Sequence, residues 1–154
     1  MKQLCWFLPL LFALGSALLA YKFMWQGATV PASDGRSVIL LTPGERDLVL
    51  AEMRAFLQAV QGVIASSRSG DMEAVAAAAR QVGGAAQGEG PASLVGKLPG
   101  EFKVLGFDTH SKFDTLALDA EQLGDPDHSL EQLTELMSNC VACHAAYRID
   151  PAQP

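Results

Sequence analysis

Apolar residues recur at intervals of three and four positions through most of the chain after residue 42, and this periodicity constrains the fold more than any other feature. The spacing places apolar side chains along one face of an α-helix. The sequence shows no strand-like alternation of any length. We therefore expect an all-α domain over residues 42–154, folded as an up-down-up-down four-helix bundle. The helices are expected to run from Thr42 to between Ser67 and Gly70, over about 71–82, from 108 or 109 to 124, and from Ser129 onward.

Capping residues mark the starts of two expected helices. Thr42 and Glu45 have the spacing of a capping box around Pro43, and Ser129 pairs in the same way with Gln132. The inward face of the first helix is expected to carry Val49, Met53, Phe56, Val60 and Ile64. The inward face of the last helix is expected to carry Leu130, Leu133, Met137, Cys140, His144 and Tyr147.

A long connection punctuated by glycine and proline covers residues 84–107. Loops of this length inside a compact domain are uncommon unless they have a function. Two interpretations stay open: the segment covers the edge of a cofactor, or it is a crossover loop packed through Leu94, Leu98, Phe102 and Leu105.

Residues 1–25 form an apolar N-terminal segment, in which Lys2 precedes the run from Leu4 to Ala20. Cleavage after Ala17 would make it a signal peptide, whereas an uncut segment reaching Trp25 is about long enough to cross a bilayer. Either fate exports the rest of the chain, so we expect a periplasmic domain, held at the inner membrane if the segment stays. Residues 26–41 are interpreted as a tether, whose apolar patch at 38–41 is either a strand fragment or a lead-in to the bundle.

Charge and residue clusters exclude several functions. The residues after position 28 carry 9 basic and 17 acidic side chains, a net charge of −8. This balance argues against nucleic acid as a partner, since nucleic-acid binding needs a basic surface. No Ser/His/Asp set or carboxylate pair suggests catalysis, so we do not expect an enzyme.

Cys140, Cys143 and His144 form a CxxCH motif, the attachment signature of a c-type haem. On one helical turn the two thiols can form thioethers to one porphyrin edge, and the adjacent imidazole can bind the iron. A redox CxxC of the thioredoxin kind normally follows a strand, and a zinc site needs two more ligands. The single motif predicts one covalent haem c. Tyr147 is expected to pack on the haem edge, and Arg148, four residues after His144, to screen a propionate or simply to favour the helix C-terminus.

The sequence from Cys140 to Arg148, CVACHAAYR, resembles the C-terminal CxxCHxxYR motif of cytochrome c prime and its low-spin relatives. The resemblance covers roughly Thr42 to Asp150 but is specific only in this motif. It implies a four-helix bundle with the haem near the end of the last helix. Low-spin relatives place a Met on the first helix within a stretch similar to Met53-Arg54, whereas gas-binding members place an apolar residue there and leave the iron five-coordinate.

The sixth position on the iron separates two expected functions. In the expected bundle, Met53 and His110 both lie at the haem end, while His128 lies at the opposite end. Met53 as ligand predicts a cytochrome that transfers single electrons to redox partner proteins. The alternative is a five-coordinate haem protein that binds NO or CO. The alanine-rich second helix, through Ala77 and Ala78, also offers a surface for a homodimer.

Overall fold

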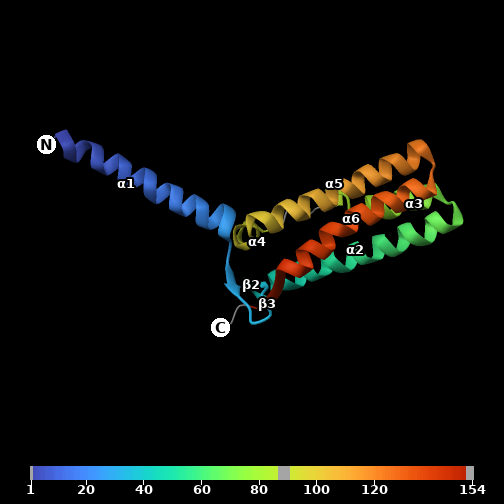
Figure 1. Cartoon of the computed structure of the whole chain (residues 1–154), viewed down its shortest axis with the longest axis horizontal. Coiled ribbons are helices and arrows are strands. Elements are labelled where there is room, and N and C mark those ends of the chain that lie inside the picture. Colours follow the sequence, from blue (N-terminus) through green and yellow to red (C-terminus); the bar gives the residue numbers. More distant parts are fainter. Residues whose placement is uncertain (1, 87–90, 152–154) are drawn as a thin grey trace.

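The computed structural model describes residues 2–86 and 91–151 and confirms an all-α fold behind an N-terminal apolar helix. Figure 1 shows that helix, α1, projecting from one end of a helical domain. The chain contains α1 (Lys2–Ala20), the π-helix η1 (Tyr21–Gln26), α2 (Pro43–Ser69), α3 (Met72–Arg80), the short 3-10 helix η2 (Gly84–Ala86), α4 (Ala92–Lys97), α5 (Gly100–Leu123) and α6 (Pro126–Ala146). Three short strands complete it: β1 (Thr29–Pro31), β2 (Ser37–Leu41) and β3 (Tyr147–Pro151).

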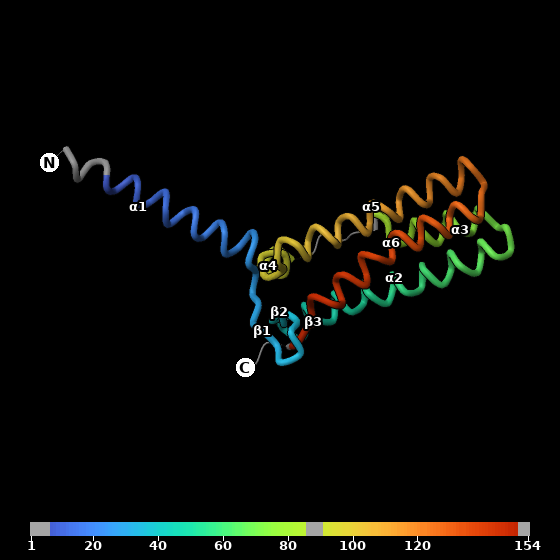
Figure 2. The backbone as a smooth tube through the Cα atoms, in the orientation of Figure 1, coloured from blue at the N-terminus to red at the C-terminus, as the bar shows by residue number. Residues whose placement is uncertain are grey.

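Four of the helices pack as a ring, in which α2 contacts α3, α3 contacts α5, α5 contacts α6 and α6 contacts α2. Figure 2 shows α2, α5 and α6 running the length of the domain, while α3 lies at the end far from α1. Because α3 has only 9 residues against 27 in α2, it fills one corner of the ring at that far end alone. A regular four-helix bundle is therefore not confirmed.

Two helices begin earlier than their sequence signals indicate. The third long helix, α5, begins at Gly100 and not at 108, and α4 occupies another part of the expected connection. The last long helix, α6, begins at Pro126 because Asp125, and not Ser129, caps it by accepting hydrogen bonds from the backbone N–H groups of Asp127 and His128. Asp before Pro supplies both the side-chain cap and the preset first turn, which Ser129 lacks.

The hydrophobic core lies between the four packed helices. On α6 the buried face differs from the predicted one: Met137 and His144 are exposed, whereas Leu136 is fully buried. On α2 the predicted residue Ile64 is exposed as well, because Ala59 and Val63 carry the buried face of that helix beyond Phe56. The central core consists of Phe56, Ala59, Val63, Val75, Ala76, Ala79, Val82, Phe113, Leu116, Ala117, Ala120, Leu133 and Leu136.

The predicted tether is part of the folded domain. β2 pairs antiparallel with β1 and parallel with β3, which continues directly from the end of α6. Ile39 and Leu41 of β2 are fully buried and pack with Val49 and Leu94. The apolar patch at 38–41 is thus part of a strand, the first of the two alternatives that the sequence left open. Its partner β3 is more than 100 residues away in the sequence.

The start of α2 has the predicted capping box. The backbone N–H of Thr42 donates to Glu45 Oε2 at 2.9 Å, and the Glu45 N–H donates to Thr42 Oγ1 at 3.4 Å. Lys97 of α4 donates to the same Glu45 oxygen at 2.6 Å. The hydrogen bond from Lys97, followed by that from Thr42, lowers the pKa of Glu45 to about 2. The buried carboxylate of Glu45 therefore fixes both the first turn of α2 and the position of α4.

The N-terminal helix suits a signal sequence or a membrane anchor. Among the described residues, two segments are long and apolar enough to cross a bilayer: Phe7–Gln26, which is 0% buried, and Pro43–Ser69. The second is α2, which buries one face in the core and is an ordinary core helix. The end of the first segment contacts the domain, since a Cβ built on Gly100 would lie 3.0 Å from the ring of Trp25.

We expect Glu45→Gln to lower the free energy of unfolding at pH 7 by about 1–2 kcal/mol, because the cap and the Lys97 ion pair are both weakened. The pKa of Glu45 is lowered on folding, so its stabilisation is present above the unfolded value of 4.5 and is lost as pH falls toward about 2. Urea unfolding of the full chain in detergent, followed by circular dichroism, measures both effects. Glu131→Gln, at an exposed position of α6, is the control and should change little.

Candidate haem-attachment site

The two cysteines of the CxxCH motif lie on one turn of α6, near its C-terminal end. Both are free thiols and half-buried, and they continue the inward side of the helix beyond Leu133 and Leu136. Burial raises the pKa of Cys140, and burial together with the charge of Cys140 raises the pKa of Cys143 to about 11. Both groups are therefore neutral thiols at pH 7. A redox-active CxxC pair instead needs a lowered thiol pKa, so the electrostatics argue against a thioredoxin-like function.

His144 follows in the last turn of α6 with an exposed imidazole. Among the described residues, its ring makes no hydrogen bond or ion pair; only its carbonyl does, accepting from Arg36 at 3.4 Å. The other two histidines are engaged. His128 contacts Asp119 at 3.4 Å, and both ring nitrogens of His110 have partners. His144 is thus the histidine whose imidazole is left for a ligand role.

Tyr147 and Arg148 do not extend the helical face of His144, because α6 ends at Ala146 and both residues belong to β3. Tyr147 packs edge-on against Phe102, with ring centroids 5.6 Å apart, and its hydroxyl donates to Glu101 at 3.4 Å. Arg148 pairs with Asp34 and Asp150. The prediction that Arg148 shares the face of His144 was wrong, since the pairing of β3 with β2 overrides the helical spacing.

Met53 and His110 have different surroundings, although both lie in the half of the domain that contains the cysteines. Met53 is half-buried on α2 and packs against both hydrophobic clusters, the central core and the one around β2. His110 is 4% exposed, with Nδ1 2.7 Å from the Val82 carbonyl and Nε2 3.1 Å from Glu52. His110 would have to give up one of these bonds to bind a metal, whereas the Met53 thioether has no competing partner to release.

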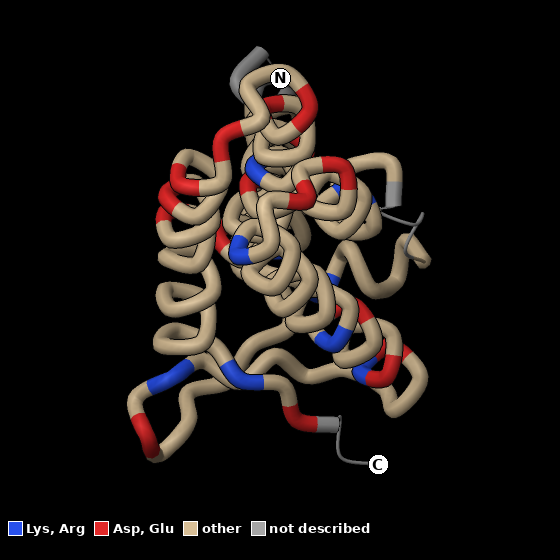
Figure 3. Tube along the Cα trace, turned by 90° about the vertical axis from the view of Figure 1, so that its right-hand side faces the viewer, with Lys and Arg blue, Asp and Glu red and all other residues tan. Residues whose placement is uncertain are grey.

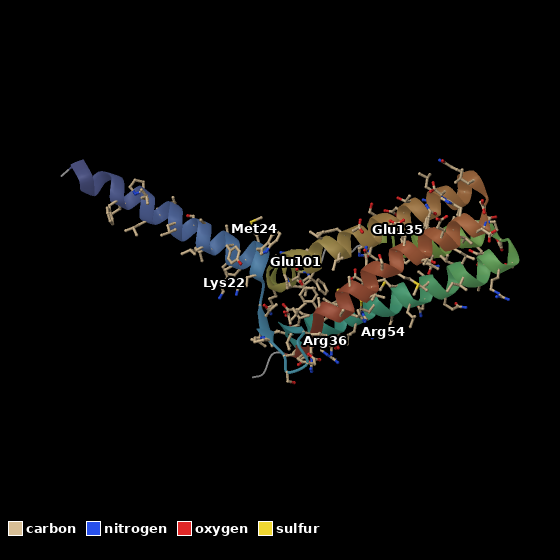
Figure 4. The ribbon with its side chains drawn as sticks, in the orientation of Figure 1. Lys22, Met24, Arg36, Arg54, Glu101 and Glu135 are labelled. Atoms are coloured by element: carbon tan, nitrogen blue, oxygen red, sulfur yellow. The ribbon has the colours of Figure 1, made fainter. Side chains whose placement is uncertain are left out.

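Two residues near the motif, Asn139 and Arg36, were not identified by sequence reasoning. Asn139, buried beside Cys140, donates to Asp108 at 2.7 Å and to Thr109 at 3.3 Å, which fixes α6 against α5. Arg36, labelled in Figure 4 close to the end of α6, donates to the His144 carbonyl and pairs with Asp34 at 2.7 Å. A buried amide on a helix seam was a usable signal for Asn139, but nothing in the sequence connects residue 36 with residue 144.

The residues present fit a covalently attached haem better than a metal ion alone. Two neutral, half-buried thiols lie one turn apart and are followed by an unengaged imidazole. Within the described ranges no three His, Cys, Asp or Glu side chains come together as a metal site would require. No protein-family model matches the chain, and no curated protein or solved structure is significantly similar to it. The resemblance to cytochrome c prime therefore rests on the motif itself.

We expect the thiols of the haem-free chain to react slowly with iodoacetamide at pH 8, because burial keeps the pKa of Cys143 near 11. Alkylation of Cys143 should be about tenfold or more slower than in the same chain unfolded in urea. Mass spectrometry of peptides after timed quenching measures the rate at each cysteine. Alkylation faster than in the unfolded chain would indicate a lowered pKa and favour a redox-active pair.

Proposed function

We propose that this protein is a mono-haem c-type cytochrome that transfers single electrons. One observation carries the proposal: two free, half-buried thiols on one turn of α6 are followed directly by a histidine whose imidazole has no partner among the described residues. This is the donor set that covalent haem c requires, two thioether-forming cysteines and an axial imidazole.

Three residues of the chain would hold the haem, and two others would support them. Cys140 and Cys143 would hold the group through thioethers, and His144 would bind the iron from one side. When bound, haem supplies a single-electron couple whose potential depends on the axial ligands, burial and nearby hydrogen bonds. Asn139 keeps α6 in place against α5, and Arg36 neutralises the carbonyl end of the helix at His144.

Met53 is the sixth ligand in this proposal. Its support is the half-buried position of the thioether between the two hydrophobic clusters, in the same half of the domain as the cysteines. His110 is the weaker candidate, since both of its ring nitrogens already have partners. Two strong axial ligands make the iron low-spin, and low-spin iron reorganises little on reduction, which suits electron transfer.

The proposed location is the periplasm, with α1 as the anchor in the inner membrane and other redox proteins as partners. The acidic excess of the domain favours a partner with a basic surface. Figure 3 shows acidic positions along the helices, with several at the turn between α5 and α6. A homodimer would have to use Ala77, which is exposed, because Ala78 lies partly buried against Gly62 of α2.

We expect one covalent haem per chain when the protein is made in a strain competent for cytochrome c maturation. Intact-mass spectrometry after acid and organic extraction should retain the added mass. Cys140→Ala or Cys143→Ala should lose one thioether, and the double variant should release the haem. A chain without residues 1–25 is the control and should gain none, since attachment follows export. An exported chain of unmodified mass would contradict the proposal.

We expect wild-type protein to be low-spin, with the weak near-infrared band of Met-to-ferric charge transfer. Met53→Ala should lose the band, become largely high-spin and bind CO rapidly, because the sixth position is then open. Absorption spectra of oxidised and reduced protein, with and without CO, measure this. Met137→Ala is the matched control, since Met137 is exposed on α6 and should leave the spectrum unchanged. A wild type that is already high-spin and binds CO at once would favour the gas-binding function, and a high-spin His110→Ala variant would make His110 the ligand.

A further inference from the structure

A large cavity lies apart from the CxxCH motif, in the corner of the helical ring that the short α3 leaves open. Its volume is about 1070 Å³, and α2, α4 and α5 supply most of its lining. The cavity wall is mostly apolar and includes the buried residues Val49, Val82 and Leu94. None of Cys140, Cys143 and His144 lines it. The cavity is of the size and composition of a pocket for a small organic molecule.

The cavity opens to the surface through large apolar side chains. Leu48, Val95 and Phe107 line it and are 52%, 44% and 57% exposed. Several large apolar groups exposed around one opening are costly in water and indicate contact with an apolar phase or ligand.

This opening lies at the end of the domain from which the N-terminal apolar helix emerges. Figure 1 shows α4 and the start of α5 at that end. A Cβ built on Gly27 would lie within 3 Å of the backbone of residues 97–99, so η1 and α4 are packed closely. In Figure 4, Met24 of η1 lies beside Glu101 of α5. If α1 is in a bilayer, the part of the cavity formed by α4 and the start of α5 therefore lies at the bilayer end of the domain, and the occupant can come from the bilayer.

One polar pair stands in the apolar wall. His110 and Glu52 both line the cavity and contact each other at 3.1 Å. The Val82 carbonyl accepts a hydrogen bond from His110 Nδ1 at 2.7 Å, and His110 Nε2 faces Glu52 Oε1. The second oxygen of Glu52 has no partner among the described residues, and the Glu52 side chain is 42% exposed, so this oxygen can accept from a hydroxyl donor.

We propose that this cavity binds the ring of a membrane quinol, with Glu52 accepting a hydrogen bond from a ring hydroxyl and the apolar wall holding the ring and the first part of its tail. A fatty acid fits the apolar wall as well, and Lys103 also lines the cavity, but its carboxylate would be repelled by Glu52. The choice of a quinol, a lipid-soluble electron carrier, rests on the proposed electron-transfer function, whereas its binding can be tested without reference to haem.

The test is calorimetric titration of the full chain in detergent with a decyl-substituted benzoquinol under argon. We expect saturable binding of one quinol per chain. The dimethyl ether of the same quinol lacks the donating hydroxyls and should bind about tenfold more weakly to wild type. The difference between the two compounds should shrink in Glu52→Gln, since an amide oxygen is a weaker acceptor than a carboxylate.

Cavity filling supplies an independent variant. Gly106 lines the cavity, and a Cβ there meets nothing within 4 Å, so Gly106→Leu should fold and should weaken quinol binding about tenfold or more. Gly96→Leu is the matched control, because Gly96 is equally unhindered but does not line the cavity.

Three results would overturn the proposal: no saturable quinol binding, binding unchanged by Gly106→Leu, or decanoate binding as tightly as the quinol without dependence on Glu52. The last would make the cavity a fatty-acyl site. A chain that binds quinol but carries no haem would leave the cavity assignment intact and defeat the proposed cytochrome function. The reverse result, haem without quinol binding, would defeat only the cavity assignment.

Discussion

The burial of strand β2 joins the two ends of the chain, and the geometry of the candidate site depends on it. Ile39 and Leu41 are fully buried between the first turns of α2 and the cluster around Leu94, while the β2 backbone pairs with β1 on one side and β3 on the other. Because β3 follows α6 directly, this pairing fixes where α6 ends and therefore where the cysteines and His144 lie. At the same end of the domain, η1 packs through Trp25 against Gly100 at the start of α5.

The second constraint is the shortness of α3. A helix of 9 residues packs only at the far end of α2 and α5. At the near end, the space between α2 and α5 is only partly filled, by the six-residue helix α4. The ion pair between Glu45 and Lys97 positions α4 there. Incomplete packing leaves the cavity, whose wall contains the pair Glu52 and His110. The pairing of His110 with Glu52 and Val82 places a polar pair in that wall, and it makes His110 a weaker candidate ligand for the proposed haem.

Much of the helical structure could be predicted because its causes are local. The Thr42–Glu45 capping box and the apolar spacing of α2 act within one or two turns, and both are present. The exact face of α6 could not be read in this way. Leu133 belongs to both the predicted and the observed face, but only packing against α2 and α5 decides that Leu136 is buried and Met137 exposed.

The sequence by itself determined an apolar N-terminal helix, an α-helical domain and a CxxCH motif on the last helix, since periodicity, capping and motif spacing are properties of neighbouring residues. Tertiary structure decided the sheet, the contact of Arg148 with Asp34, the partners of His110 and the cavity beside α4. These features join residues that are far apart in the sequence: His110 lies 28 residues after Val82, and β3 lies more than 100 residues after β2. Such residues are brought together by the packing of the whole domain and not by any local preference.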